Sequence, residues 1–218
     1  MKKILTLILV LLMCAICITG CSKEVYSGTT EKTATSDNGG TKEMNADAAY
    51  EYQTRDPKAG ETIAIIHTDF GDIKMRFLED VAPVACENFI TLAKDGKYDK
   101  TIFHRIIEGF MIQGGDYTNF DGTGGESCFG KEFDNEVAEG ISNIEGSVAM
   151  ANAGPDTNGS QFYINQVDNT YLDGGYTVFG WVYEGMDVVN AIAAVKTDGS
   201  DRPLEDVVVE SVEVQEYK

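Results

Sequence analysis

Short runs of alternating apolar and polar residues dominate the chain from residue 62 onward. Residues 62–68 and 72–77 have the composition of two β-strands, and residues 69–72 between them that of a hairpin turn. Further strands are predicted between glycine-rich loops, at residues 102–107, 111–114, 147–151, 161–165, 177–183 and 207–214. The pattern therefore predicts a mainly β domain.

Two segments follow a helical period instead. In residues 81–94, Val81, Ala85, Phe89 and Leu92 fall on one face, and Pro83 suits a first helical turn. A second helix is predicted over residues 186–196. Many short strands and two helices within about 155 residues favour one closed β-barrel capped by helices.

The N-terminus has the pattern of a targeting signal. Lys2 and Lys3 precede an apolar run, residues 4–18, which is shorter than the roughly 20 apolar residues that a membrane-spanning helix needs. The run ends in Ile18-Thr19-Gly20-Cys21, which resembles the lipobox of bacterial lipoprotein precursors. That resemblance implies cleavage before Cys21 and lipidation of its thiol. An ordinary signal peptide with a chance cysteine, or an uncleaved anchor, is the alternative.

The segment between the signal and the first strand is polar. It is rich in Ser, Thr, Lys, Asp, Glu and Gly, and it offers too little apolar surface to offset the entropy of ordering the chain. We therefore expect three parts: a signal peptide at 1–20, a lipidated N-terminus with a disordered linker at 21–60, and a folded domain at 61–218.

Charge and cysteine content narrow the functional classes. The formal net charge of -19 repels phosphate backbones and anionic headgroups, so we expect no nucleic-acid binding and attachment to the membrane only through the lipid. Of five cysteines, Cys86 and Cys128 remain in the folded part. They could form one bridge, but the absence of a motif spacing favours two unpaired thiols without a catalytic role.

Residues 103–116, FHRIIEGFMIQGGD, have an unusual composition for a structural strand. Because side chains alternate along a strand, Phe103, Arg105 and Ile107 are predicted to share one face, and Met111 and Gln113 to share a face of the next strand. A cation beside aromatic, thioether and amide groups is typical of a shallow ligand pocket. Only two histidines are present, so a metal site or a His-based catalytic triad is poorly supported.

Several motifs resemble the cyclophilin family in order and spacing: VAPVACENF, FHRIIEGFMIQGGD, GTGG, SVAMANAGPDTNGSQFYI and YLDGGYTVFGWVYEGMDVV. The resemblance covers residues from about 62 to the C-terminus. It implies a closed eight-stranded antiparallel β-barrel capped by two α-helices. It also implies peptidyl-prolyl cis-trans isomerase activity, no cofactor or metal, and a groove for X-Pro peptides.

The resemblance also implies roles for individual residues. Arg105 matches the family's catalytic arginine, and Phe110 and Gln113 stand with it at the reacting bond. Phe103 and His104 match positions that support the site from within. The positions implied to bind substrate are Phe110, Met111, Gln113, Thr123, Ala151, Asn152, Ala153, Gln161, Tyr163, Tyr171, Leu172 and Tyr176.

Three of these positions depart from the family pattern. Tyr163 replaces the usual phenylalanine of the proline pocket, Tyr171 the groove-edge tryptophan of the eukaryotic pattern, and Tyr176 a nearby histidine. Tyrosine keeps the aromatic wall but changes its depth and its hydrogen-bond donor. We therefore expect weaker inhibition by cyclosporin, the family's cyclic-peptide inhibitor.

Three functions are consistent with these features. The first is a monomeric isomerase, lipid-anchored at the extracytoplasmic face of the cell membrane, that acts on X-Pro bonds of emerging polypeptides. The second is a tethered module that binds proline peptides as an adhesin or holdase, with incidental catalysis. The third, a purely structural surface lipoprotein, predicts no binding of proline peptides.

Overall fold

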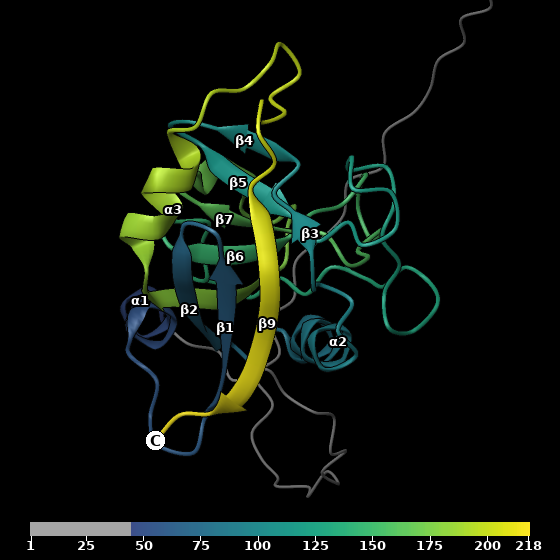
Figure 1. The fold of residues 1–218 in the computed structure, drawn as a ribbon. Coiled ribbons are helices and arrows are strands. Elements are labelled where there is room, and N and C mark those ends of the chain that lie inside the picture. The colour runs from purple at the N-terminus through teal and green to yellow at the C-terminus, as the bar shows by residue number, and fades with distance from the viewer. Residues whose placement is uncertain (1–44) are drawn as a thin grey trace, which may run out of the picture. The chain divides into compact units, whose positions relative to one another are not determined.

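The computed structural model describes residues 45–218, and the predicted signal peptide, lipidation site and first part of the linker lie outside them. One antiparallel sheet of nine strands curls around the core in the order β3-β9-β1-β2-β8-β6-β7-β5-β4 (Figure 1). The strands are β1 (Thr62–Thr68), β2 (Gly71–Phe77), β3 (Thr101–Ile102), β4 (Arg105–Ile107), β5 (Met111–Gly114), β6 (Ser147–Met150), β7 (Phe162–Asn165), β8 (Val178–Glu184) and β9 (Val208–Glu216).

The helices are α1 (Ala46–Thr54), α2 (Pro83–Lys94) and α3 (Met186–Ala193), with a short 3-10 turn η1 (Thr170–Leu172). Contacts join α2 to β9, α3 to β2, and α1 to β8. In Figure 1, α2 and α3 lie on opposite sides of the curled sheet. None of the helices in residues 45–218 is long and apolar enough to cross a bilayer.

The predicted mainly β architecture is confirmed, but the closed eight-stranded barrel is not found. The sheet has nine strands, and β3 and β4 end it without pairing to each other. The predicted strand 102–107 breaks at Phe103 and His104, where the Phe103 N–H donates to Val207 O at 3.0 Å. The chain thus runs directly from β3 at one edge of the sheet to β4 at the other edge. Within residues 45–218 no strand-to-strand hydrogen bonds join these two edges, so the barrel stays open between them.

Helix α1 lies inside the segment that was expected to be a disordered linker, so that expectation is wrong for residues 46–54. The helix begins at Asn45, whose side chain accepts the Ala48 N–H at 2.9 Å, a standard N-cap. Ala49 and Gln53, four residues apart and therefore on one face, are fully buried. Tertiary packing, and not apolar content, orders this helix.

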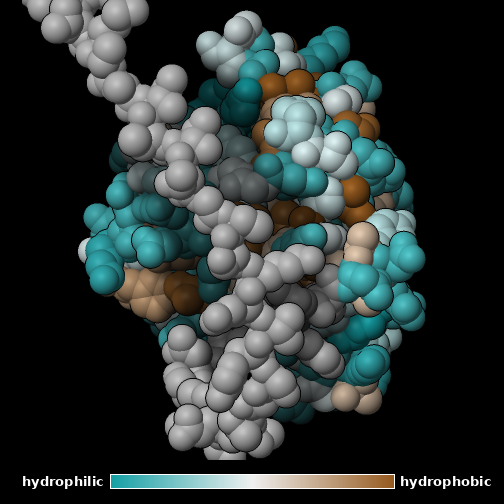
Figure 2. Space-filling view, turned by 180° about the vertical axis from the view of Figure 1, so that it is seen from behind, coloured by the Kyte–Doolittle hydropathy of each residue, from teal (hydrophilic) through white to brown (hydrophobic). Residues whose placement is uncertain are grey.

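The core centres on Phe89, the residue that the helical pattern of residues 81–94 directs inward. Its ring lies 4.8 Å from Tyr98, 5.2 Å from Phe162 and 5.4 Å from Phe179, measured between centroids. These contacts fix α2 against β7 and β8 through aromatic packing. Figure 2 shows the molecule from the side opposite to Figure 1. On this side most of the described surface is hydrophilic, and hydrophobic residues are exposed only in small areas.

Candidate active site

A cavity of about 130 Å³ opens over β4, β5 and β7. Nine of the residues singled out from the sequence line it, although they come from five separate segments of the chain. They are Arg105, Phe110, Met111, Gln113, Ala151, Asn152, Tyr163, Leu172 and Tyr176.

Strand register explains why three of these residues meet. Arg105 on β4 pairs with Gln113 on β5, and Gln113 pairs with Tyr163 on β7. Residues directly opposite each other in antiparallel strands project from the same face. The sheet therefore sets a cation, an amide and an aromatic ring in one row across the floor of the cavity.

Arg105 is held from one side only. Its Nε lies 3.4 Å from Asp201 Oδ2, and both side chains are about two-fifths exposed, at 43% and 42%. An ion pair this exposed contributes about 0–1 kcal/mol and orients the guanidinium more than it stabilises the fold. Within residues 45–218 the two terminal nitrogens of Arg105 have no hydrogen-bonding partner, which leaves them available at the cavity.

Aromatic rings form the walls of the cavity. Phe110 and Tyr171 stack with centroids 6.2 Å apart and planes 21° apart, and Tyr171 is 73% exposed. Tyr171 thus stands on the rim and does not line the cavity itself. Tyr163 and Tyr176 also line the cavity, and their rings meet edge to face with centroids 5.7 Å apart.

The hydroxyl of Tyr163 is already satisfied. It donates to Asn143 Oδ1 at 2.7 Å in a buried hydrogen bond. Burial, and then the nearby Tyr176 and Asp173, raise the pKa of Tyr163 well above its usual range. The extra hydroxyl is therefore neutral and turned toward Asn143, so the wall remains close to that of a phenylalanine.

A second, larger cavity of about 550 Å³ adjoins the first. The two share Gln113, Ala151 and Asn152 as lining residues, so they are contiguous. Three further positions singled out from the sequence line the larger cavity, namely Thr123, Ala153 and Gln161, and Tyr171 lines neither cavity.

Two glutamines connect the cavities. Gln113 Nε2 donates to Gln161 Oε1 at 2.9 Å, and Gln161 Nε2 donates to the carbonyls of Gly122 and Gly124 at 2.9 and 2.8 Å. Both of these hydrogen bonds from Gln161 therefore hold the glycine-rich loop at residues 122–125. Gln113 keeps its carbonyl oxygen free of partners within residues 45–218, and that oxygen can accept a peptide N–H.

Asp116 organises the same loop, and the motif analysis assigned it no role. The side chain is fully buried and accepts five backbone N–H groups, from Thr118, Asn119, Asp121, Gly122 and Gly124. Burial acts to raise the pKa of Asp116, but these hydrogen bonds outweigh it and hold the pKa well below its usual range. A signal existed in the sequence, since an Asp with Thr and Asn two and three residues later, and then glycines, is typical of side-chain-capped turns.

Phe103 and His104 lie beneath the site. Phe103 is fully buried, whereas Arg105 and Ile107 are partly exposed, so the predicted common face of these three residues is wrong. The strand break at residues 103–104 is the reason. A Cβ on Gly122 would lie 2.9 Å from the His104 ring, so the loop rests directly on the imidazole, whose pKa burial lowers.

Cys86 and Cys128 are both free, which confirms the prediction of two unpaired thiols. Cys86 is buried, and burial raises its pKa well above the usual range, which makes it a poor nucleophile. In residues 45–218 no cluster of three or more His, Cys, Asp or Glu side chains is arranged to hold a metal ion.

Comparison with known proteins agrees with the motifs. Residues 63–214 match the family model described as cyclophilin type peptidyl-prolyl cis-trans isomerase/CLD. The chain belongs to the cyclophilin family. Helix α1 precedes the matched residues, whereas the described site residues all lie inside them.

Relatives extend this finding. A peptidyl-prolyl cis-trans isomerase of Rhizopus delemar is 49% identical over 155 residues, which are 71% of this chain and 24% of the relative. The chain thus spans about a quarter of that cyclophilin's length. A protein of Staphylococcus aureus strain USA300 is 38% identical over 197 residues, covering 78% of this chain and 100% of the relative.

Solved structures of cyclophilins have the same fold. A crystal structure of a cyclophilin type peptidyl-prolyl cis-trans isomerase of Cryptosporidium parvum superimposes with a TM-score of 0.70 at 34% identity, covering 72% of this chain and 99% of the other. A second structure of that protein, in the presence of the dipeptide Ala-Pro, gives a TM-score of 0.69 at 35% identity.

Proposed function

We propose that this cyclophilin domain is a peptidyl-prolyl cis-trans isomerase that acts on X-Pro bonds of extracytoplasmic polypeptides. The row of Arg105, Gln113 and Tyr163 at the base of an aromatic-walled cavity is the observation that carries the proposal. Family membership supports it, as does the presence of Ala-Pro with the related Cryptosporidium cyclophilin.

The chemistry requires no nucleophile. Rotation about a peptide bond faces a barrier of about 18–20 kcal/mol because the C–N bond has partial double-bond character. As the amide twists, its nitrogen becomes pyramidal and gains a lone pair that accepts a hydrogen bond. The free guanidinium nitrogens of Arg105 are permanent donors, and they can reach this nitrogen or the proline carbonyl.

The remaining residues hold the peptide while one bond turns. Phe110, Met111 and Leu172 enclose the proline ring, and the free oxygen of Gln113 accepts a backbone N–H. Uncatalysed isomerisation takes about 10–100 s. A turnover of about 10³ per second then requires the barrier to fall by roughly 7 kcal/mol, which one strong hydrogen bond, desolvation and orientation together can supply.

The cellular setting is also part of the proposal. The sequence Ile18-Thr19-Gly20-Cys21 supports cleavage and lipidation at Cys21, which would place a monomeric domain at the extracytoplasmic face of the cell membrane. Metabolic labelling with a fatty acid tests this directly. Label should enter the wild-type chain and be absent from Cys21→Ala, and equal labelling of both would contradict it.

Exchange spectroscopy on a short Ala-Pro peptide tests the activity, with residues 45–218 as the enzyme. Wild type should catalyse cis-trans exchange, and Arg105→Ala should lower kcat/KM by about 10²–10³, the size expected for removing one preorganised donor. Lys74→Ala, which removes a partly exposed cation on β2, is the matched control and should leave exchange unchanged. If the wild type bound the peptide without catalysing exchange, the isomerase proposal would fail and the alternative, a tethered module that binds proline peptides, would be favoured.

A further inference from the structure

Helix α1 contacts the rest of the domain through the side chain of Gln53. This side chain is fully buried, and its amide makes two reciprocal hydrogen bonds with the backbone of Ser142. Gln53 Nε2 donates to Ser142 O at 2.7 Å, and Ser142 N–H donates to Gln53 Oε1 at 3.0 Å. The side-chain amide of Gln53 thus pairs with Ser142 as a backbone amide does in an antiparallel sheet. These two hydrogen bonds fix the position of the loop that carries Ser142.

The same loop holds the segment that follows the proline pocket. Ser142 Oγ donates to Asp173 Oδ2 at 2.5 Å, while the backbone and side-chain N–H groups of Asn143 donate to Asp173 Oδ1 at 2.7 and 3.0 Å. Asp173 directly follows Leu172, which lines the small cavity. The position of this wall is therefore tied to residues 142 and 143.

Asn143 reaches a second wall of the cavity. Its Oδ1 accepts the hydroxyl of Tyr163, and its backbone carbonyl accepts the N–H of Asn169 at 2.7 Å. Asn169 in turn donates through Nδ2 to the carbonyl of Phe110 at 3.0 Å. Through one buried asparagine, three aromatic or apolar residues of the pocket share a common support.

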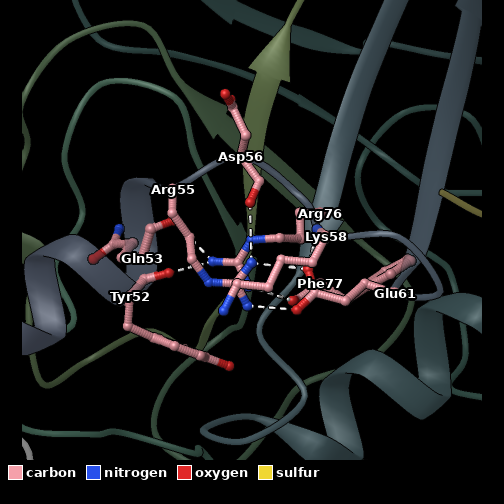
Figure 3. A network of polar contacts seen from close by, with 8 residues as sticks. All are labelled: Tyr52, Gln53, Arg55, Asp56, Lys58, Glu61, Arg76 and Phe77. Carbon is pink, nitrogen blue, oxygen red and sulfur yellow. Dashed lines mark hydrogen bonds and ion pairs between the residues drawn. The ribbon is translucent and has the colours of Figure 1, made fainter. Parts of the chain in front are cut away.

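Arg76 on β2 holds the C-terminal end of α1. Its buried guanidinium donates to the carbonyls of Tyr52 and Gln53 in the last turn of α1 and to Phe77 O, as Figure 3 shows. Carbonyls at a helix C-terminus lack intrahelical partners and carry partial negative charge, so they suit a buried cation. Without α1, Arg76 would lose two of these three acceptors, which makes helix and cation mutually dependent.

We propose that α1 is a positioning element of the active site, and that Gln53 is a positioning residue that acts through Ser142 and Asn143 on Leu172 and Tyr163. The inference rests on the proposed isomerase function. The segment that joins the N-terminal part of the chain to the domain then also sets the width of the proline pocket. Close packing supports this, since a Cβ on Gly140 would lie 2.6 Å from the Cβ of Ala49.

The test compares Gln53→Ala with Glu51→Ala in the full chain. Glu51 is an exposed residue of the same helix, so truncating it removes a side chain of similar length without touching Ser142. For Gln53→Ala we expect kcat/KM toward an Ala-Pro peptide to fall about tenfold, mainly through KM, because the pocket wall contacts ground state and transition state alike. Glu51→Ala should match wild type.

The division between KM and kcat separates positioning from folding. A merely structural role would lower the active fraction, and hence the apparent kcat, with KM unchanged; that result would overturn the proposal. Backbone amide resonances of Leu172 and Tyr163 provide a readout independent of catalysis. They should shift in Gln53→Ala and stay fixed in Glu51→Ala, and fixed resonances in both variants would also overturn it.

A second variant covers the case in which Gln53→Ala fails to fold. Ser142→Ala removes only the hydroxyl bond to Asp173 and keeps both backbone bonds to Gln53. It should shift the Leu172 resonance and raise KM by a smaller factor. If wild type itself lacked exchange activity, the proposed function would fail, while the resonance shifts and the peptide dissociation constant would still decide the role of α1.

Discussion

The Tyr163 hydroxyl donates a 2.7 Å hydrogen bond to Asn143 Oδ1, beneath the wall of the small cavity that we propose to bind proline. Asn143 is itself buried, and the same oxygen also accepts from Asn165 Nδ2 at 3.3 Å. The tyrosine that departs from the family pattern is therefore joined to the polar network under the pocket and does not present its hydroxyl to a proline ring.

Tyr163→Phe should consequently affect stability more than activity. Loss of one buried neutral hydrogen bond costs about 1 kcal/mol of unfolding free energy, or about 2–4 °C in Tm for a domain of this size. Thermal denaturation and peptide exchange measure the two effects. Tyr176→Phe is the matched control, since its hydroxyl has no partner within residues 45–218. A large loss of exchange with unchanged Tm would contradict this reading of Tyr163.

Asp116→Asn should destabilise the domain at neutral pH. An amide cannot accept all five N–H groups, and its own NH₂ would face donors, so we expect a loss of about 1.5–3 kcal/mol. Urea denaturation at pH 7 measures it, with the exposed Glu205→Gln as control.

The difference in stability between wild type and Asp116→Asn should depend on pH. The pKa of Asp116 is depressed in the folded state, so its contribution is present above the unfolded-state pKa of about 3.9 and declines as pH falls below that value toward the folded pKa. The stability gap between wild type and Asp116→Asn should therefore narrow below about pH 4. A gap that stayed constant down to pH 3 would show that ionisation of Asp116 is not what stabilises the loop.

Arg76→Met should release α1. The change retains apolar volume but leaves the carbonyls of Tyr52 and Gln53 without their donor, at a cost of about 1.5–3 kcal/mol for hydrogen bonds to a charged group. Hydrogen exchange should accelerate at the amides of residues 50–55. Lys74→Met on the same strand removes only an exposed ion pair and should leave these amides protected. Equal protection in both variants would refute the anchoring role of Arg76.

Tyr171→Trp should strengthen cyclosporin inhibition. Tyr171 is the exposed rim residue stacked on Phe110, and an indole adds contact area and an N–H donor at the place where the resemblance implies a tryptophan. One added aromatic contact of about 1 kcal/mol corresponds to roughly a fivefold lower inhibition constant. Inhibition of peptide exchange measures it, with Tyr50→Trp on the exposed face of α1 as control. An unchanged inhibition constant would show that Tyr171 does not limit inhibitor affinity.

Much of the fold followed from local pattern. Strand alternation and the helical face of residues 81–94 predicted β5 to the residue and α2 to within two residues. Helix α2 is predictable because it buries one face, which its apolar spacing records, and β5 because a short run bounded by glycines is typical of a largely buried strand. The motifs likewise brought Arg105, Phe110, Met111 and Gln113 into one site, because two strands joined by a tight turn keep their residues adjacent.

What the sequence by itself determined was the family, the place of most strands and the residues that line the small cavity. Tertiary structure alone decided that β3 and β4 do not pair, that Phe103 is buried and that residues 46–54 form the ordered helix α1. Local pattern misses these because their causes are distant in the chain: Gln53 is ordered by Ser142 and by Arg76, and neither partner alters the polar character of the segment in which Gln53 lies. A polar residue that is buried by complementary hydrogen bonds has the same sequence signature as one exposed to water.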